Sequence, residues 1–185
     1  MVHVRSPAVL ARLQWVVEHH GEAAFDATLA AMAPGLAAEI RGVVDPAEWV
    51  SFDAYVNLSS AIDARYGKGD LALCRELGRY SARVNLPTLY RIFYQFGSVR
   101  FILGKATAVW SEHYDSGRAS TRDVGPKEVA IVVEDFATPH AVHCLSVLGW
   151  IEATVTISGA KLVSAEEVAC RRRGDEACEL RVRYE

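Results

Sequence analysis

The last eight residues of the chain alternate strictly between inward and outward positions of an extended strand. The apolar parity holds Cys178, Leu180, Val182 and Tyr184, and the charged parity holds Glu179, Arg181, Arg183 and Glu185. Successive side chains of a strand point to opposite faces, so this segment is predicted to be a strand with one apolar face. A Gly-Asp turn signal at 174–175 predicts a hairpin with a partner strand that ends near Cys170. On that partner strand Val168 and Cys170 share a parity, so Cys170 and Cys178 should both face inward.

The chain before Tyr114 carries helical signals instead. Ser6-Pro7 is a typical helix start, and apolar residues recur at helical spacing from there to Gly21. Further helices are predicted over 23–32, 34–42, 51–67, 71–84, from Pro87 to Gly97, and over 99–110.

After Tyr114 the pattern changes to strands. The β-branched run 129–134 is predicted to pair with a preceding strand at 118–124, and a long helix is predicted from Pro139 through Trp150. The predicted fold class is α+β: a helical N-terminal half, then β-hairpin, long helix and β-hairpin, with a small antiparallel sheet.

Composition narrows the classes of function. With 185 residues, half of them apolar, the chain can bury one substantial core. A net charge of −3, with Arg171–Arg173 as the only basic run, argues against nucleic acid as a partner. No apolar run is long enough to span a membrane and no signal segment is evident, so a cytoplasmic protein is expected. In a reducing compartment four cysteines favour buried thiols or a zinc site over a Cys170–Cys178 disulfide.

Three motifs follow one another in the C-terminal part: Trp110-x3-Tyr114-Asp-Ser-Gly117, Pro139-x4-Cys144-x4-Gly149-Trp150-Ile-Glu152 and Glu167-x2-Cys170-x3-Gly174-Asp175-x2-Cys178. Together they resemble the 4-vinyl reductase (V4R) domain family, which includes the sensor domains of phenol-responsive transcription activators. The resemblance covers residues 85–185. Residues 1–84 form a predicted helical N-terminal extension, similar to that of myxobacterial paralogue families carrying this domain. The resemblance to the V4R family also implies a distant relation in fold to the haem nitric-oxide-binding domains and the TRAPP trafficking subunits.

The resemblance implies a structural zinc site. In the phenol sensors one cysteine of the long helix and a Glu-x2-Cys-x7-Cys group hold zinc, and Cys144, Glu167, Cys170 and Cys178 fall on those positions. Three thiolates and a carboxylate make a closed tetrahedral set. However, inward cysteines are also ordinary core residues, and a regular strand would put Glu167 and Cys170 on opposite faces, so a bulge or loop at 165–169 is required. His140 and His143 are potential substitute ligands, but beside a proline at a helix start they are expected to be exposed bystanders.

The haem-binding relatives suggest a second cofactor. Tyr114, Ser116 and Arg118 match the letters Tyr-x-Ser-x-Arg, with which that family holds the haem propionates. No histidine occurs between His20 and His113, where a helical iron ligand upstream of this motif should lie. The sequence analysis therefore expects no haem.

No nucleotide-binding glycine motif, nucleophile elbow or cysteine with a paired base is evident, so the chain is not expected to be an enzyme. The leading hypothesis is a sensor domain that binds a small apolar or aromatic ligand between helices and sheet. Its candidate pocket residues, which could equally be plain core, are Tyr94, Phe101, Trp110, His113 and Trp150. The alternative is an interaction module that forms a homodimer or binds a signalling partner, with the aromatic segment 87–110 as its face.

Overall fold

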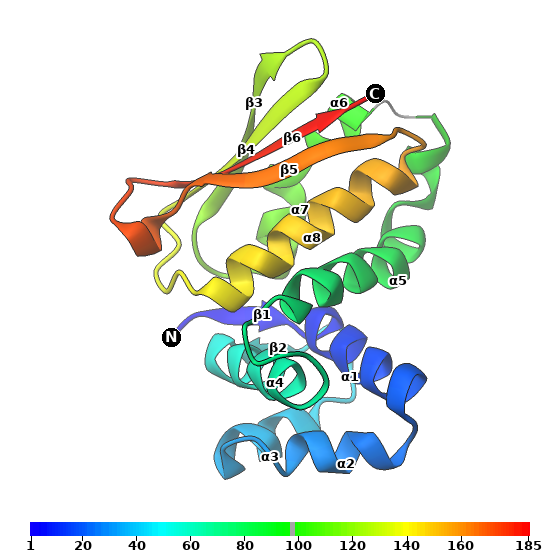
Figure 1. Cartoon of the computed structure of the whole chain (residues 1–185), viewed down its shortest axis with the longest axis vertical. Coiled ribbons are helices and arrows are strands. Elements are labelled where there is room, and N and C mark those ends of the chain that lie inside the picture. Colours follow the sequence, from blue (N-terminus) through cyan, green and yellow to red (C-terminus); the bar gives the residue numbers. More distant parts are fainter. Residues whose placement is uncertain (97–98) are drawn as a thin grey trace.

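The computed structural model describes residues 1–96 and 99–185, without the side chains of residues 87–96 and Ala106. Its helices are α1 (Pro7–His20), α2 (Ala23–Leu29), α3 (Pro34–Gly42), α4 (Phe52–Tyr66), α5 (Leu73–Phe96), α6 (Val99–Leu103), α7 (Ala106–His113) and α8 (Ala141–Ile157). The strands are β1 (His3–Arg5), β2 (Trp49–Ser51), β3 (Arg118–Gly125), β4 (Glu128–Glu134), β5 (Leu162–Ala169) and β6 (Cys178–Tyr184). The predicted α+β class is thus confirmed: a helical part precedes hairpin, long helix and hairpin (Figure 1). No helix of the described residues has the length and apolar character needed to cross a membrane.

The main sheet is antiparallel, with strand order β3-β4-β6-β5. In its centre Ile131 of β4 lies opposite Leu180 of β6. Both side chains are buried, and they pack with Leu148, Ile151 and Val155 of α8. The apolar parity of the last strand therefore faces α8, which runs along one face of the sheet (Figure 1).

Helix α5 packs against the side of α8 that faces away from the sheet (Figure 1). The two helices meet at glycines. A Cβ atom added to Gly149 of α8 would collide with the backbone oxygen of Arg75, and one added to Gly78 of α5 would collide with that of Ser146. The Ser146 hydroxyl also donates to the Cys74 carbonyl of α5 across 3.1 Å. The helix backbones are therefore in direct contact.

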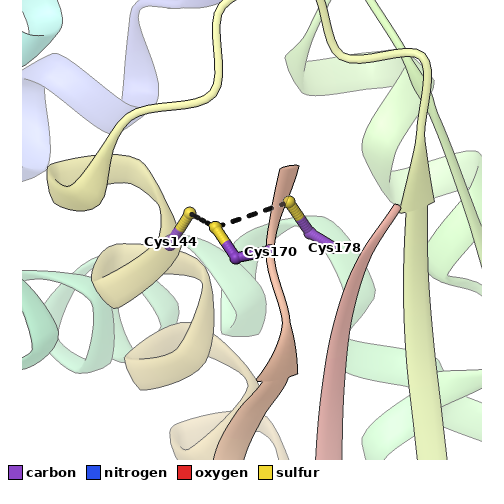
Figure 2. Close-up of side chains that lie close together, drawn as sticks. All are labelled: Cys144, Cys170 and Cys178. Carbon is purple, nitrogen blue, oxygen red and sulfur yellow. Dashed lines mark hydrogen bonds between the residues drawn. The ribbon is translucent and has the colours of Figure 1, made fainter. Parts of the chain in front are cut away.

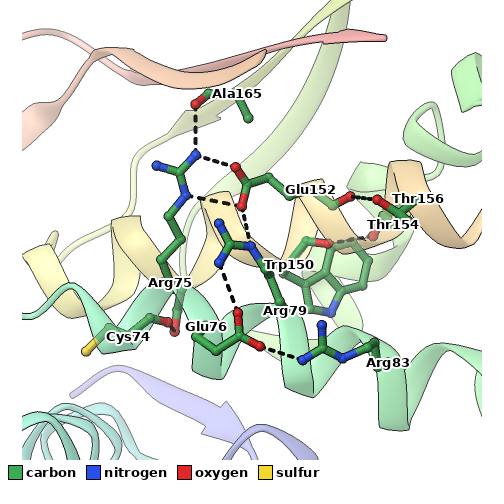
Figure 3. Close-up of polar contacts among 11 residues, drawn as sticks. Cys74, Arg75, Glu76, Arg79, Arg83, Trp150, Glu152, Thr154, Thr156 and Ala165 are labelled. Carbon is green, nitrogen blue, oxygen red and sulfur yellow. Dashed lines mark hydrogen bonds and ion pairs between the residues drawn. The ribbon is translucent and has the colours of Figure 1, made fainter. Parts of the chain in front are cut away.

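A polar network flanks this contact (Figure 3). Glu152 of α8 is only 4% exposed, and its carboxylate accepts hydrogen bonds from Arg75 and Arg79 of α5. Arg75 also donates to the Ala165 carbonyl of β5 across 3.0 Å. A buried carboxylate needs such partners because desolvation of its charge is costly. The network joins α5, α8 and β5.

The N-terminal part is attached to the segment between α7 and β3 by a short strand that sequence periodicity did not predict. β1 pairs with β2 through three residues, and Val4 of β1 also forms a bridge to Tyr114 after α7. The imidazole of His3 lies 2.6 Å from the carboxylate of Asp115, which strengthens the same junction.

Two helix boundaries differ from those predicted. α5 continues through Pro87, where two helices were expected, so residue 84 lies inside a helix. The predicted helix 99–110 is divided into α6 and α7 around Gly104 and Lys105. Because α5 packs against both α1 and α8, tertiary contacts outweigh the local proline signal.

Candidate functional site

Three of the four cysteines meet at one end of the sheet, beside the start of α8 (Figure 2). Cys144 lies in the first turn of α8, Cys170 follows β5, and Cys178 begins β6. All three are buried. The Sγ atom of Cys170 lies 3.8 Å from that of Cys144 and 4.0 Å from that of Cys178, and the three sulfurs are within 4.8 Å of one another.

The hairpin between β5 and β6 brings Cys170 and Cys178 together. A short 3-10 turn at Arg171–Arg173 leads into Gly174, whose φ of 95° is one that glycine adopts without strain. The Asp175 carboxylate then accepts the N–H of Cys170 across 2.7 Å. The chain therefore turns at Gly174 and Asp175, where the sequence predicted the hairpin turn.

The three cysteines are free thiols, because the distances between their sulfur atoms are far longer than the roughly 2.05 Å of a disulfide bond. Tetrahedral zinc with Zn–S bonds near 2.3 Å requires sulfurs about 3.8 Å apart, which is close to the two separations observed. A hydrogen bond from the Cys144 thiol lowers the pKa of Cys178 to about 6, and the same bond raises the pKa of Cys144. One thiol of the cluster thus ionises easily.

Glu167 reaches the same region because β5 is irregular. The register of β5 against β6 shifts between Glu167 and Ala169. Val168 is 38% exposed, although its parity predicted an inward position, whereas Glu167 lines a small cavity with Cys144 and Cys178. Its Oε1 atom accepts from Arg173 Nη1 across 2.5 Å and lies outside the group of three sulfurs.

His143 is buried, contrary to the expectation of an exposed bystander. Its ring stacks on Phe136 at 4.6 Å between centroids and makes edge contacts with Phe52 and Trp110. Its Nε2 atom has no hydrogen-bond partner in the described part of the chain, and burial lowers its pKa to about 3. His143 also lines the small cavity beside Cys144, while His140 caps α8 by accepting the N–H of Val142.

A larger cavity lies between the helices and the sheet. Its volume is about 110 Å³, and it opens to solvent. Its described wall is mostly apolar and comes from α1, α4, α5, α6, α7, α8, β3 and β4.

The five residues predicted for a pocket are placed as follows. Trp110, His113 and Trp150 lie on the cavity wall. Phe101 is 45% exposed and does not belong to the described wall; the ammonium of Lys105 lies 5.0 Å from its ring centroid. Tyr94 falls outside the described side chains.

Polar groups also reach this cavity, and two of them, Arg12 and Tyr55, were not singled out by the sequence pattern. Arg12 of α1 and Tyr55 of α4 line it, and Arg12 is 1% exposed. His113 places Nδ1 2.8 Å from the Val109 carbonyl, and burial lowers its pKa. The position of Arg12, at helical spacing from apolar Ala8 and Val16, was the only sequence signal for it, and this signal does not reveal its bonding partners.

The three residues of the Tyr-x-Ser-x-Arg motif do not all line the cavity. Tyr114 lines it, but the Ser116 hydroxyl accepts the N–H of Ala137 across 3.1 Å. Arg118 is at the surface, where its side chain, 71% exposed, pairs with Asp135 at 2.8 Å.

No family model matches this chain, and no curated protein matches its sequence significantly. Solved structures share its fold. An H-NOX protein from S. oneidensis in the Fe(II)NO ligation state gives a TM-score of 0.75 at 12% identity, covering 97% of this chain and 98% of that one. An oxygen-binding H-NOX domain related to soluble guanylate cyclases gives 0.71 at 15%, covering 98% and 95%. A mutant of T. Tengcongensis H-NOX gives 0.75 at 15%, covering 98% and 97%.

These likenesses contradict the expectation that no haem binds, since structures of this fold include one that probes haem distortion in the H-NOX family. That expectation rested on the absence of a histidine well upstream of Tyr114, whereas the fold places His113, directly before Tyr114, on the cavity wall. The comparisons do not show zinc, and the closer resemblance to V4R domains stays a prediction. The distant relation in fold is confirmed: the chain has the fold of the H-NOX domains.

Proposed function

We propose that this chain is a non-catalytic sensor or ligand-binding domain of V4R type that takes a small apolar or aromatic molecule into the larger cavity. The observation that carries this proposal is the cavity itself, whose wall is mostly apolar with a few polar groups, as is usual for ligand sites. Trp110 and Trp150 offer aromatic surface on its two sides, from α7 and α8. A ligand held there would contact the helices and the sheet together, so its presence could be signalled to a partner protein.

The proposal assigns a structural role to the cysteine cluster. Cys144, Cys170 and Cys178 would hold a metal ion of the kind that prefers thiolates, with zinc as the first candidate, and Glu167 would supply the fourth ligand. Such an ion would fasten the start of α8 to the hairpin of β5 and β6. Support comes from the sulfur separations and from the register shift after Glu167, which lets Glu167 and Cys170 lie on the same side of β5.

Ligand binding can be tested by thermal unfolding with toluene, phenol, 1-decanol and decanoate as probes. A ligand present at a hundred times its Kd adds about 2.7 kcal/mol of stability. This should raise the Tm of a chain of this size by roughly 5–10 °C. Filling the cavity by Ala119→Phe should abolish the shift, whereas Ala31→Phe at an exposed helix end should leave it unchanged. No shift with any probe in the wild type would refute the proposal.

Haem is a specific candidate for the occupant. The Nδ1–H of His113, which lines the cavity, can donate to the Val109 carbonyl; this would orient the ring and leave Nε2 as the nitrogen available to a metal. Arg12 and Lys105 provide positive charge on the same wall for propionates, in place of Arg118. These residues could therefore hold a haem, which when bound would supply an iron centre able to take a diatomic gas.

Adding haem to the purified protein should produce a sharp, shifted Soret band through ligation by His113. His113→Ala should remove that shift, because it deletes the only imidazole among the described lining residues. His140→Ala is the matched control, since His140 caps α8 outside the cavity. A Soret band that is identical in wild type and His113→Ala would show that His113 is not the iron ligand.

The second candidate function is a dimerisation module. It is favoured by Phe101, which α6 leaves 45% exposed beside Lys105. Light scattering distinguishes the dimerisation module from the ligand-binding sensor. A dimerisation module requires a dimer that persists on dilution, and Phe101→Glu should convert this dimer to a monomer.

A further inference from the structure

Arg12 is a buried guanidinium that lines the larger cavity. Its Nε donates to the Ser59 hydroxyl across 2.7 Å, and its Nη1 donates to the Ala8 carbonyl across 2.6 Å. Its Nη2 donates to the hydroxyls of Tyr55 and Ser146, at 2.7 and 2.5 Å. These four bonds leave one of the five guanidinium N–H groups without an assigned acceptor.

All four acceptors are neutral. They satisfy N–H groups but do not cancel the charge, and arginine does not lose its proton inside proteins. A buried charge without a counter-ion costs several kcal/mol. In the described part of the chain no carboxylate forms an ion pair with Arg12: buried Asp63 accepts the N–H groups of Leu71 and Leu73, and buried Glu152 binds the arginines of α5.

The rest of the cavity wall also has an excess of positive charge over negative charge. Of the described lining residues, Arg12 and Lys105 carry positive charge and none is acidic. Tyr114 lies beside Tyr55, and burial raises its pKa, so its hydroxyl stays protonated and can donate. A buried cation and two phenol side chains thus belong to a wall that is otherwise mostly apolar.

We propose that the occupant of the cavity is an apolar molecule that carries a carboxylate, and that this carboxylate pairs with Arg12. The inference rests on the proposed ligand-binding function and adds the chemical class of the ligand. A carboxylate would supply the missing counter-charge and accept the remaining N–H, while its apolar body would cover Trp110 and Trp150. Haem carries the same chemistry through its propionates, and the Soret band of the loaded protein distinguishes it from a small acid.

The test compares acids with alcohols of the same shape. Calorimetric titration of the wild-type protein would use decanoate against 1-decanol, and 4-phenylbutyrate against 4-phenylbutanol. At least one acid is expected to bind ten times more tightly than its alcohol. Alcohols that bind as tightly as the acids would overturn this inference and leave the proposed ligand-binding function intact. If no probe of either pair binds, both fail.

Variants then assign the preference to one residue. Arg12→Met should reduce the affinity for the acid to that for its alcohol, with the alcohol changed less than threefold. Arg12→Lys should keep the preference, and Arg41→Met, a matched change of an exposed arginine of α3 outside the cavity wall, should change it less than threefold. A preference for the acid that survives in Arg12→Met would overturn the assignment. The wild-type comparison needs no variant and stands even if Arg12→Met does not fold.

Discussion

Replacing Gly149 with alanine should lower the free energy of unfolding by about 3 kcal/mol. Its Cβ would collide with the Arg75 carbonyl oxygen, which belongs to the backbone of α5 and cannot rotate away as a side chain could. The two helices would have to separate, which would loosen the close packing on both sides of the contact. Gly78→Ala should act similarly, because its Cβ would meet the Ser146 oxygen. Urea denaturation followed by circular dichroism measures both.

Gly35→Ala is the matched control for these substitutions. Gly35 lies in α3, and no atom lies within 4 Å of a Cβ added there. Alanine lowers the entropy of the unfolded chain, so this variant should be about 0.5–1 kcal/mol more stable than wild type. If Gly149→Ala unfolded within 1 kcal/mol of wild type with the same m value, the backbone contact between α5 and α8 would be disproved.

Stripping metal from the cysteine cluster should lower the Tm by more than about 10 °C, because structural metal ions contribute several kcal/mol or more to folding. Purified wild-type protein should contain about one equivalent of zinc. Cys170→Ser should lose it, since this sulfur lies between the other two. Cys74→Ala should keep it, because Cys74 is equally buried but packs against α4, near the Ser59 carbonyl. Elemental analysis and thermal unfolding with a chelator give the two readouts.

The fourth ligand is tested by separate variants. Glu167→Gln should weaken metal retention against a chelator, whereas His143→Phe should retain the metal and preserve the aromatic packing on Phe136. Loss of the metal in His143→Phe alone would move the fourth position to that imidazole. Wild-type protein with no metal and no response to a chelator would refute the site altogether.

Local sequence pattern was sufficient for the C-terminal hairpin. The alternation from Cys178 onward determines which side chains face α8, and the Gly174-Asp175 signal determines where the chain turns. The position of Glu167 could not be derived in this way. A period of two places it opposite Cys170, and only the register shift against β6, a property of the paired strands, brings it to the cluster side.

The surroundings of single buried polar residues could not be predicted from local sequence pattern. Arg12 bonds to Ser146, which is 134 residues away, so nothing in its own helix reveals that bond. His143 is enclosed by aromatic rings from α4, α7 and the segment after β4. The long α5 was missed for a related reason: its neighbours α1 and α8, rather than its own proline, decide that it continues.

The backbone contact between α5 and α8 limits how this molecule can move. Helices held apart by side chains can slide as rotamers change, but two backbones in contact at Gly78 and Gly149 leave no such play. The two helices must therefore move together as one rigid body. Any change of shape that accompanies occupation of the cavity has to occur where this helix pair contacts the sheet or the N-terminal helices.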